Sequence, residues 1–224
     1  MPATRAVAAP WRSRRLDRMP FGDRVATEAE LRALFPAPTA NAYRKQIDRL
    51  DEHCHTLIAA SPILFLATAG ADGSCDVAPK GGPPGFARGL GERRLVIPEG
   101  KGNNRLDSLV NVLANPNVGM LFVIPGRNET LRVNGRATLT TDPEVLELVP
   151  LHGRTPVLAL DVEADEVYTH CGKAFIRSEL WDPGTWPATG ELPSPAEVLR
   201  AHVGDQTLEQ IEARLHESYT ERLW

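Results

Sequence analysis

The spacing of apolar residues predicts helices near the start, middle and end of this chain. Two segments carry an apolar face at helical spacing, residues 41–60 and the segment that follows Arg105. Their apolar stripes are formed by Ile47, Leu50, Cys54, Leu57 and Ile58 in the first, and by Leu106, Leu109, Val110 and Leu113 in the second. Terminal signals predict further helices at residues 27–35, which begin with a Thr-x-x-Glu capping box, and at residues 141–144, 174–180 and 207–223.

Short apolar runs bounded by turn residues predict six β-strands. A turn at residues 71–73 joins the first two strands, and the Gly- and Pro-rich residues 81–85 must form a loop. The predicted strands are residues 62–69, 74–80, 93–98, 118–124, 129–140 and 156–170. Because few long helices separate them, we expect a mainly β fold with flanking helices (α+β), built as an antiparallel barrel rather than a parallel sheet.

Shifts in composition divide the chain into four segments. We expect a basic, flexible tail over residues 1–26, a helical extension over 27–60, a barrel domain over 61–181, and a Pro-rich linker with a C-terminal helix over 182–224. The tail carries five arginines within its first twenty residues against Asp17 alone, and it lacks the apolar core of a secretory signal.

Charge and cysteine content exclude several functional classes. The net charge of −4 provides no overall basic field for nucleic acid. Three cysteines lie far apart without a CxxC pair, as expected for a reduced, cytoplasmic protein. No apolar run is long enough to span a membrane. His53 and His55 are two residues apart and do not share a helix face, so no metal site is predicted there.

The segment from Lys101 to Arg105 has the composition of an anion site. Asn103 or Asn104 is a natural N-cap for the helix that follows, and a helix start offers unpaired backbone N–H groups and a positive dipole end. With Lys101 and Arg105 beside it, a phosphate is a better match than a carboxylate. On local physics alone, a capped surface helix with exposed basic residues explains the segment equally well.

Four motifs in residues 61–181 resemble those of the pyridoxamine 5′-phosphate oxidase-like flavoproteins. They are PILFLATAGADGSCDVAPKGG, NNRLDSLVNVLANPNVGMLF, ETLRVNGRATL and EVYTHCGKAFIRSELWDP, in the same order along the chain, and the last is similar to an uncharacterised bacterial branch of that family. The resemblance implies an FMN-binding split β-barrel, a homodimer, and FMN lying at the subunit interface.

The resemblance also implies a role for individual residues. Lys80 would meet the FMN phosphate, and the polar triplet Asn103, Asn104 and Arg105 would complete the phosphate cradle. The remaining implied contacts are the backbone of Val77, Ala78 and Pro79 along the ribityl chain and ring, the backbone of Pro98 and Glu99 near the ring, Thr130 and Arg132 at its polar edge, and Arg177 and Trp181 from the other subunit. On the residues alone, Lys80 is explained as a surface lysine, and Arg132 as part of a solvent-exposed strand face.

Two departures separate this chain from the oxidase itself. Cys75 stands where the oxidase has an arginine, and Trp181 is followed by Asp182-Pro183 instead of an arginine–histidine–arginine pattern. We therefore predict an FMN-dependent oxidoreductase of unknown small-molecule substrate that is not a pyridoxamine phosphate oxidase. The alternative is a non-catalytic protein that binds flavin, a deazaflavin or haem. The sequence identifies no side chain as a general acid or base.

Overall fold

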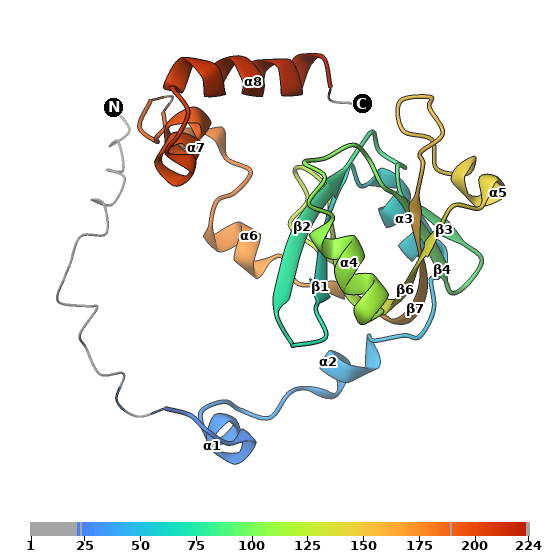
Figure 1. Cartoon of the computed structure of the whole chain (residues 1–224). Helices are drawn as coiled ribbons and strands as arrows, with labels where there is room; N and C mark the ends of the chain where they lie inside the picture. The colour runs from blue at the N-terminus through green and yellow to red at the C-terminus, as the bar shows by residue number, and fades with distance from the viewer. Residues whose placement is uncertain (1–21, 23, 189, 223–224) are drawn as a thin grey trace.

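The computed structural model describes residues 22, 24–188 and 190–222. Within them seven strands form one antiparallel sheet in the order β2-β1-β5-β6-β7-β4-β3 (Figure 1). The strands are β1 (Ile63–Ala69), β2 (Cys75–Gly81), β3 (Arg88–Leu90), β4 (Arg94–Pro98), β5 (Asn117–Val123), β6 (Thr130–Thr140) and β7 (Ala159–His170). The predicted antiparallel, mainly β architecture is confirmed. β3, only three residues long, was not predicted.

The sheet wraps around a single main core. Leu64 and Leu66 of β1 belong to the same buried cluster as Leu95 and Ile97 of β4, although β1 and β4 lie toward opposite ends of the strand order. Strand alternation sends every second side chain of each strand into this core and leaves the others on the outer face. The long β6–β7 pair carries a register shift at Asn134/Gly135, which bends the sheet.

The predicted helix over residues 41–60 is wrong as a single helix. The chain forms α2 (Ala40–Arg44) and α3 (Glu52–Ala60), and the backbone between them turns to the sheet, where Ile47 exchanges hydrogen bonds of 3.0 and 2.8 Å with Val167. Asp51 then restarts the helix by accepting a hydrogen bond from the backbone N–H of Cys54. The predicted apolar stripe still packs on the core, with Leu50, Cys54 and Ile58 buried and Ile47 and Leu57 partly buried.

Helix α4 (Asp107–Ala114) begins later than predicted, and most of its apolar stripe is exposed. Its N-cap is Leu106, in the left-handed conformation with φ 61°, rather than Asn103 or Asn104. Leu109 and Val112 are buried, whereas three of the four residues of the expected apolar stripe are exposed: Leu106, Val110 and Leu113. Polar anchors set this orientation, because Ser108 donates to Asp76 of β2 and Asn111 donates to Thr68 of β1.

The remaining helices lie around the barrel and beyond it (Figure 1). Helix α1 (Glu28–Ala33) has the predicted capping box of Thr27 and Glu30. The others are α5 (Pro143–Leu146), α6 (Lys173–Arg177), the 3-10 turn η2 (Pro183–Thr185), α7 (Pro195–Val203) and α8 (Leu208–Thr220). α7 follows the predicted linker and was not anticipated; it packs against α8. The arginines of the predicted basic tail lie outside the described residues. No helix of the described residues is long and apolar enough to cross a membrane.

Candidate functional site

Lys80 and Glu99 meet at the place where the sheet does not close. Lys80 lies at the end of β2, an edge strand, and Glu99 follows β4 near the other end of the strand order. Lys80 Nζ lies 2.6 Å from Glu99 Oε2, and the two side chains are only 14% and 19% exposed. This ion pair therefore ties the two ends of the sheet together, and it brings the predicted phosphate lysine to the start of the 99–106 loop.

The 99–106 loop holds the predicted phosphate triplet at the start of α4. Asn103 Oδ1 accepts a hydrogen bond of 3.0 Å from the Arg105 N–H, and Asn104 has φ 60°. The α4 N-terminus has no side-chain cap, so its first N–H groups face outward from the helix start. Arg105, 72% exposed, pairs instead with Asp107 at 2.9 Å. Two of the three predicted phosphate cations, Lys80 and Arg105, thus already have a carboxylate partner.

The outer face of the sheet presents a row of side chains across five strands. The register aligns Pro79, Phe65, Leu121, Arg132 and Tyr168 on β2, β1, β5, β6 and β7. Their neighbours along each strand, such as Leu64 and Leu131, point into the core. At the β2 end the row is apolar and exposed, and at the β7 end it is cationic and aromatic. Such a strip matches the flat face and polar edge of a planar ring system.

A cluster of basic groups surrounds Tyr168 at the polar end of this row. Lys45 Nζ and Arg132 Cζ lie 5.0 and 5.5 Å from the centre of the Tyr168 ring, and the His170 ring lies 5.1 Å away. Burial, followed by the charges of Arg132 and Lys45, lowers the pKa of His170. Arg132 donates through Nε to Asn134, and Lys45 donates to the Thr169 carbonyl. Sequence reasoning identified Arg132 but missed Lys45 and Tyr168, since Lys45 is distant in the sequence and carries no local motif.

The other predicted residues fall into separate surroundings. Val77 and Pro79 are exposed on β2, Ala78 is half-buried on its opposite face, and Pro98 is buried. Thr130 is buried beside His170 at the end of the β6–β7 pair. Trp181 stacks on Phe175 and donates its indole N–H to the carbonyl of Arg127, and Arg177 is exposed at the end of α6. The described contacts of Trp181 are therefore with α6 and the turn before β6.

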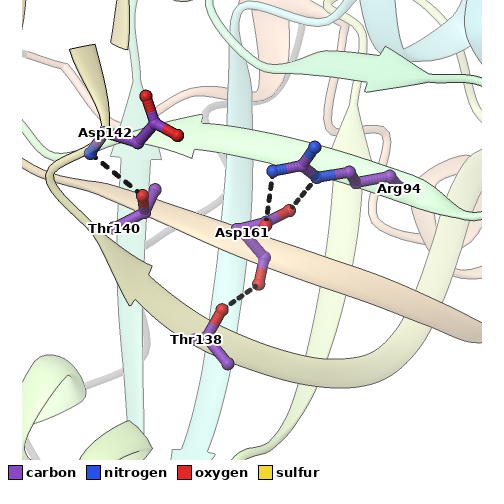
Figure 2. Close-up of polar contacts among 5 residues, drawn as sticks. All are labelled: Arg94, Thr138, Thr140, Asp142 and Asp161. Atoms are coloured by element: carbon purple, nitrogen blue, oxygen red, sulfur yellow. Dashed lines mark hydrogen bonds and ion pairs between the residues drawn. The ribbon is translucent and has the colours of Figure 1, made fainter. Parts of the chain in front are cut away.

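Two further polar regions have structural explanations. Arg94 makes a bidentate ion pair with Asp161, with both N···O distances 2.7 Å, and Thr138 donates to the Asp161 carbonyl (Figure 2). Of the acidic residues along β7, Asp161 and Asp165 pair with Arg94 and Arg93 across the strands rather than being only solvated. No group of three or more His, Cys, Asp or Glu side chains in the described part of the chain could hold a metal ion.

An open cavity of about 490 Å³ lies between α3, the 83–89 segment and residues Leu148 and Pro150. Its two basic groups are engaged with the chain itself, because His55 Nε2 lies 2.9 Å from the Gly91 carbonyl and Arg88 donates to the Leu148 carbonyl. Nothing in the sequence predicted this cavity, and none of the predicted site residues lines it.

Solved structures with a similar fold include three bacterial proteins. HupZ of Group A Streptococcus has 20% identity and a TM-score of 0.43, over 53% of this chain and 92% of that one. A putative pyridoxamine 5′-phosphate oxidase of Lactobacillus delbrueckii has 21% identity and a TM-score of 0.41, over 55% and 99%. An FMN-binding protein of Syntrophomonas wolfei has 9% identity and a TM-score of 0.43, over 52% and 83%.

Among curated proteins no significant match was found. The sequence model of one family, described as pyridoxamine 5′-phosphate oxidase, matches residues 50–171, which is more than half of the 224 residues. The match runs from just before α3 to just after β7. The chain therefore belongs to the pyridoxamine 5′-phosphate oxidase family.

Proposed function

We propose that this protein is an FMN-dependent oxidoreductase that acts on a small molecule as a homodimer. The observation that carries the proposal is the approach of Lys80 of β2 to Glu99, which begins the loop that bears Arg105. The row from Pro79 to Tyr168 lies on the other face of the same sheet and begins at the residue next to Lys80. Lys80 and Arg105 support a phosphate, and the apolar and aromatic row supports a planar ring, which are the two parts of FMN.

The roles proposed for individual residues follow the two parts of the ligand. Lys80, Asn103, Asn104 and Arg105 would hold the phosphate, with the uncapped N–H groups of α4 nearby. The backbone of the edge strand β2 at Val77, Ala78 and Pro79, and that of Pro98 and Glu99, would line the ribityl chain and ring, and Thr130 and Arg132 would meet its polar edge.

The chemistry of such a site is supplied by the cofactor, which when bound accepts a hydride and passes electrons on. The chain's own residues bind and orient the cofactor. Arg132 is held in place by its hydrogen bond to Asn134 and its position over Tyr168, so a fixed positive charge stands at the polar end of the strip. A positive charge there would stabilise negative charge on a bound ring.

Exposed apolar residues on β2 and α4 support a dimer in which a second copy of the chain covers this surface. Val77 is 63% exposed, and Val110 and Leu113 on α4 are 57% and 75% exposed. α4 packs on β1 and β2, so these side chains belong to neighbouring elements. Apolar side chains gathered in this way are typical of protein interfaces. In the dimer, Arg177 and Trp181 of the partner subunit would approach the flavin. Free cysteines at positions 54, 75 and 171 support a reducing, cytoplasmic location.

We propose further that the substrate is not pyridoxamine phosphate. Asp182 follows Trp181 and caps the η2 turn by accepting a hydrogen bond of 2.9 Å from the Gly184 N–H. A carboxylate in this place would repel a substrate phosphate where the oxidase has a cationic clamp. Robust conversion of pyridoxamine phosphate to pyridoxal phosphate would contradict this part of the proposal.

The alternative is a non-catalytic protein that binds flavin, a deazaflavin or haem for sequestration or sensing. What favours it is that the carboxylate within the proposed site, Glu99, is bound to Lys80. No general acid or base is therefore assigned there.

The decisive experiment is the absorption spectrum of the purified protein, with mass analysis of the released ligand and reduction by a nicotinamide donor. A flavin spectrum that bleaches rapidly with the donor supports the oxidoreductase, and a stable unreduced ligand supports the binding protein. Arg105→Ala should weaken FMN about tenfold by removing a charge-assisted contact. Arg14→Ala, in the basic tail, is the matched control and should leave FMN affinity unchanged. Light scattering that finds a monomer still holding FMN would contradict the dimer.

A further inference from the structure

The Lys80–Glu99 ion pair occupies the cation on which the proposed phosphate site depends. At 2.6 Å the ammonium and the carboxylate are in direct contact. Both side chains are largely withdrawn from water, with exposed fractions of 14% and 19%, so water screens their interaction only weakly. A phosphate that contacts Lys80 must therefore either displace Glu99 or accept a negative charge close beside it.

The second cation of the site offers an internal comparison. Arg105 also has a carboxylate partner, Asp107, but its side chain is 72% exposed and that of Asp107 is 48% exposed. Water screens this exposed pair, and the carboxylate can swing aside at little cost. The Lys80–Glu99 pair is only 14% and 19% exposed, so water screens it less and separating the two groups costs more.

We infer that Glu99 is a specificity-determining residue, which discriminates against a dianionic phosphate on the ligand by holding Lys80 in an ion pair. The inference rests on the proposed function and concerns its selectivity. The chain's own carboxylate acts as a resident competitor for the phosphate, whereas a ligand without phosphate does not compete with it. Affinity for phosphorylated flavin relative to riboflavin is therefore set by Glu99 through Lys80, and far less by Asp107.

The experiment measures binding of FMN and of riboflavin by fluorescence quenching to the full-length wild-type protein and its variants. Glu99→Gln keeps the size and hydrogen-bonding capacity of the side chain and removes its charge. It should tighten FMN at least tenfold and change riboflavin affinity less than threefold. In the Lys80→Gln background the same substitution should bring no gain. Asp107→Asn, the matched control at the exposed pair, should change FMN affinity less than threefold.

Several outcomes separate this inference from the proposed function. If the wild type binds FMN and a folded Glu99→Gln variant binds it no more tightly, the inference alone is overturned. The Lys80–Glu99 pair would then only stabilise the fold. If Glu99→Gln still raises FMN affinity in the Lys80→Gln background, Glu99 does not act through Lys80, and the inference is overturned. If Glu99→Gln proves unfolded in circular dichroism, Glu99→Asp, which shortens the side chain and lengthens the ion pair, should give a smaller gain for FMN only, and no gain would overturn the inference. Failure of every protein to bind either flavin would overturn the proposed function and this inference with it.

Discussion

The barrel and the hairpin formed by α7 and α8 are stabilised in different ways. In the barrel, side chains from strands far apart in the sequence are fully buried together, including Leu64, Leu95 and Leu160. In the hairpin only Ala196 and Ile211 are buried, and the main packing partner of each helix is the other helix. Burial that depends on many distant strands is lost as a whole, whereas a local pair of helices can open alone. The comparison therefore predicts unequal responses to substitution.

The largest effect is expected at Gly135 in the barrel. A Cβ atom there would collide with the backbone carbonyl of Glu163 on β7, at the register shift between β6 and β7. A backbone neighbour in the centre of a sheet cannot move aside. Gly135→Ala should lower the free energy of unfolding by about 4 kcal/mol or more, measured by urea denaturation. Gly102→Ala, whose Cβ would meet nothing within 4 Å, is the control and should stay within about 0.5 kcal/mol.

A matched pair of core truncations tests the difference directly. Leu64 and Ile211 are both 0% exposed, one in the barrel and one in the hairpin. Leu64→Ala should lower the global free energy of unfolding by about 2–5 kcal/mol. Ile211→Ala should leave the urea midpoint of the barrel nearly unchanged while amide exchange accelerates in α7 and α8. Equal global losses would mean that the hairpin and the barrel unfold together.

How far the fold was predictable depended on whether its cause was local. Strands β1 and β2 were predicted because a turn and alternating residues lie within twenty positions of each other. The break between α2 and α3 was not, because it depends on Val167, which lies 120 residues from Ile47 and holds its backbone. Likewise, the apolar stripe of α4 was predicted from the residue spacing, but hydrogen bonds from Ser108 to Asp76 and from Asn111 to Thr68 decide which side of the helix meets the sheet.

The candidate site shows the same limit. Lys80 and Glu99 were both singled out from the sequence, but as separate contacts to a cofactor. Their ion pair forms only because the sheet brings its two ends together, and no local pattern encodes that closure. Lys45 reaches Tyr168 and Thr169 across more than a hundred residues, for the same reason.

A pH-dependent effect of intermediate size is expected from the barrel alone. Burial and the charges of Arg132 and Lys45 lower the pKa of His170 in the folded chain below the ordinary value of 6.5. The unfolded chain then binds the proton more readily, so the contribution is fully present above pH 6.5 and is lost as the pH falls toward the folded pKa. Urea denaturation between pH 5 and 8 should show this loss in the wild type and a smaller one in His170→Gln. His216→Gln, on the exposed face of α8, should keep the wild-type profile.

The smallest effects are expected from two ion pairs, one in each region. Arg94 of β4 donates two hydrogen bonds of 2.7 Å to the carboxylate of Asp161 on β7 (Figure 2). The hydrogen bond with Asp161 raises the pKa of Arg94. Arg222 meets Glu217 at 3.2 Å near the end of α8, with both side chains about half exposed. Bidentate geometry between strands should make Arg94→Gln cost about 0.5–1 kcal/mol, and Arg222→Gln about 0–0.3 kcal/mol, by urea denaturation at low salt. Added salt should shrink the first loss, because the Arg94 side chain is 47% exposed. If the two variants lost equal free energy of unfolding, the unequal response of barrel and hairpin to substitution would not extend to their ion pairs.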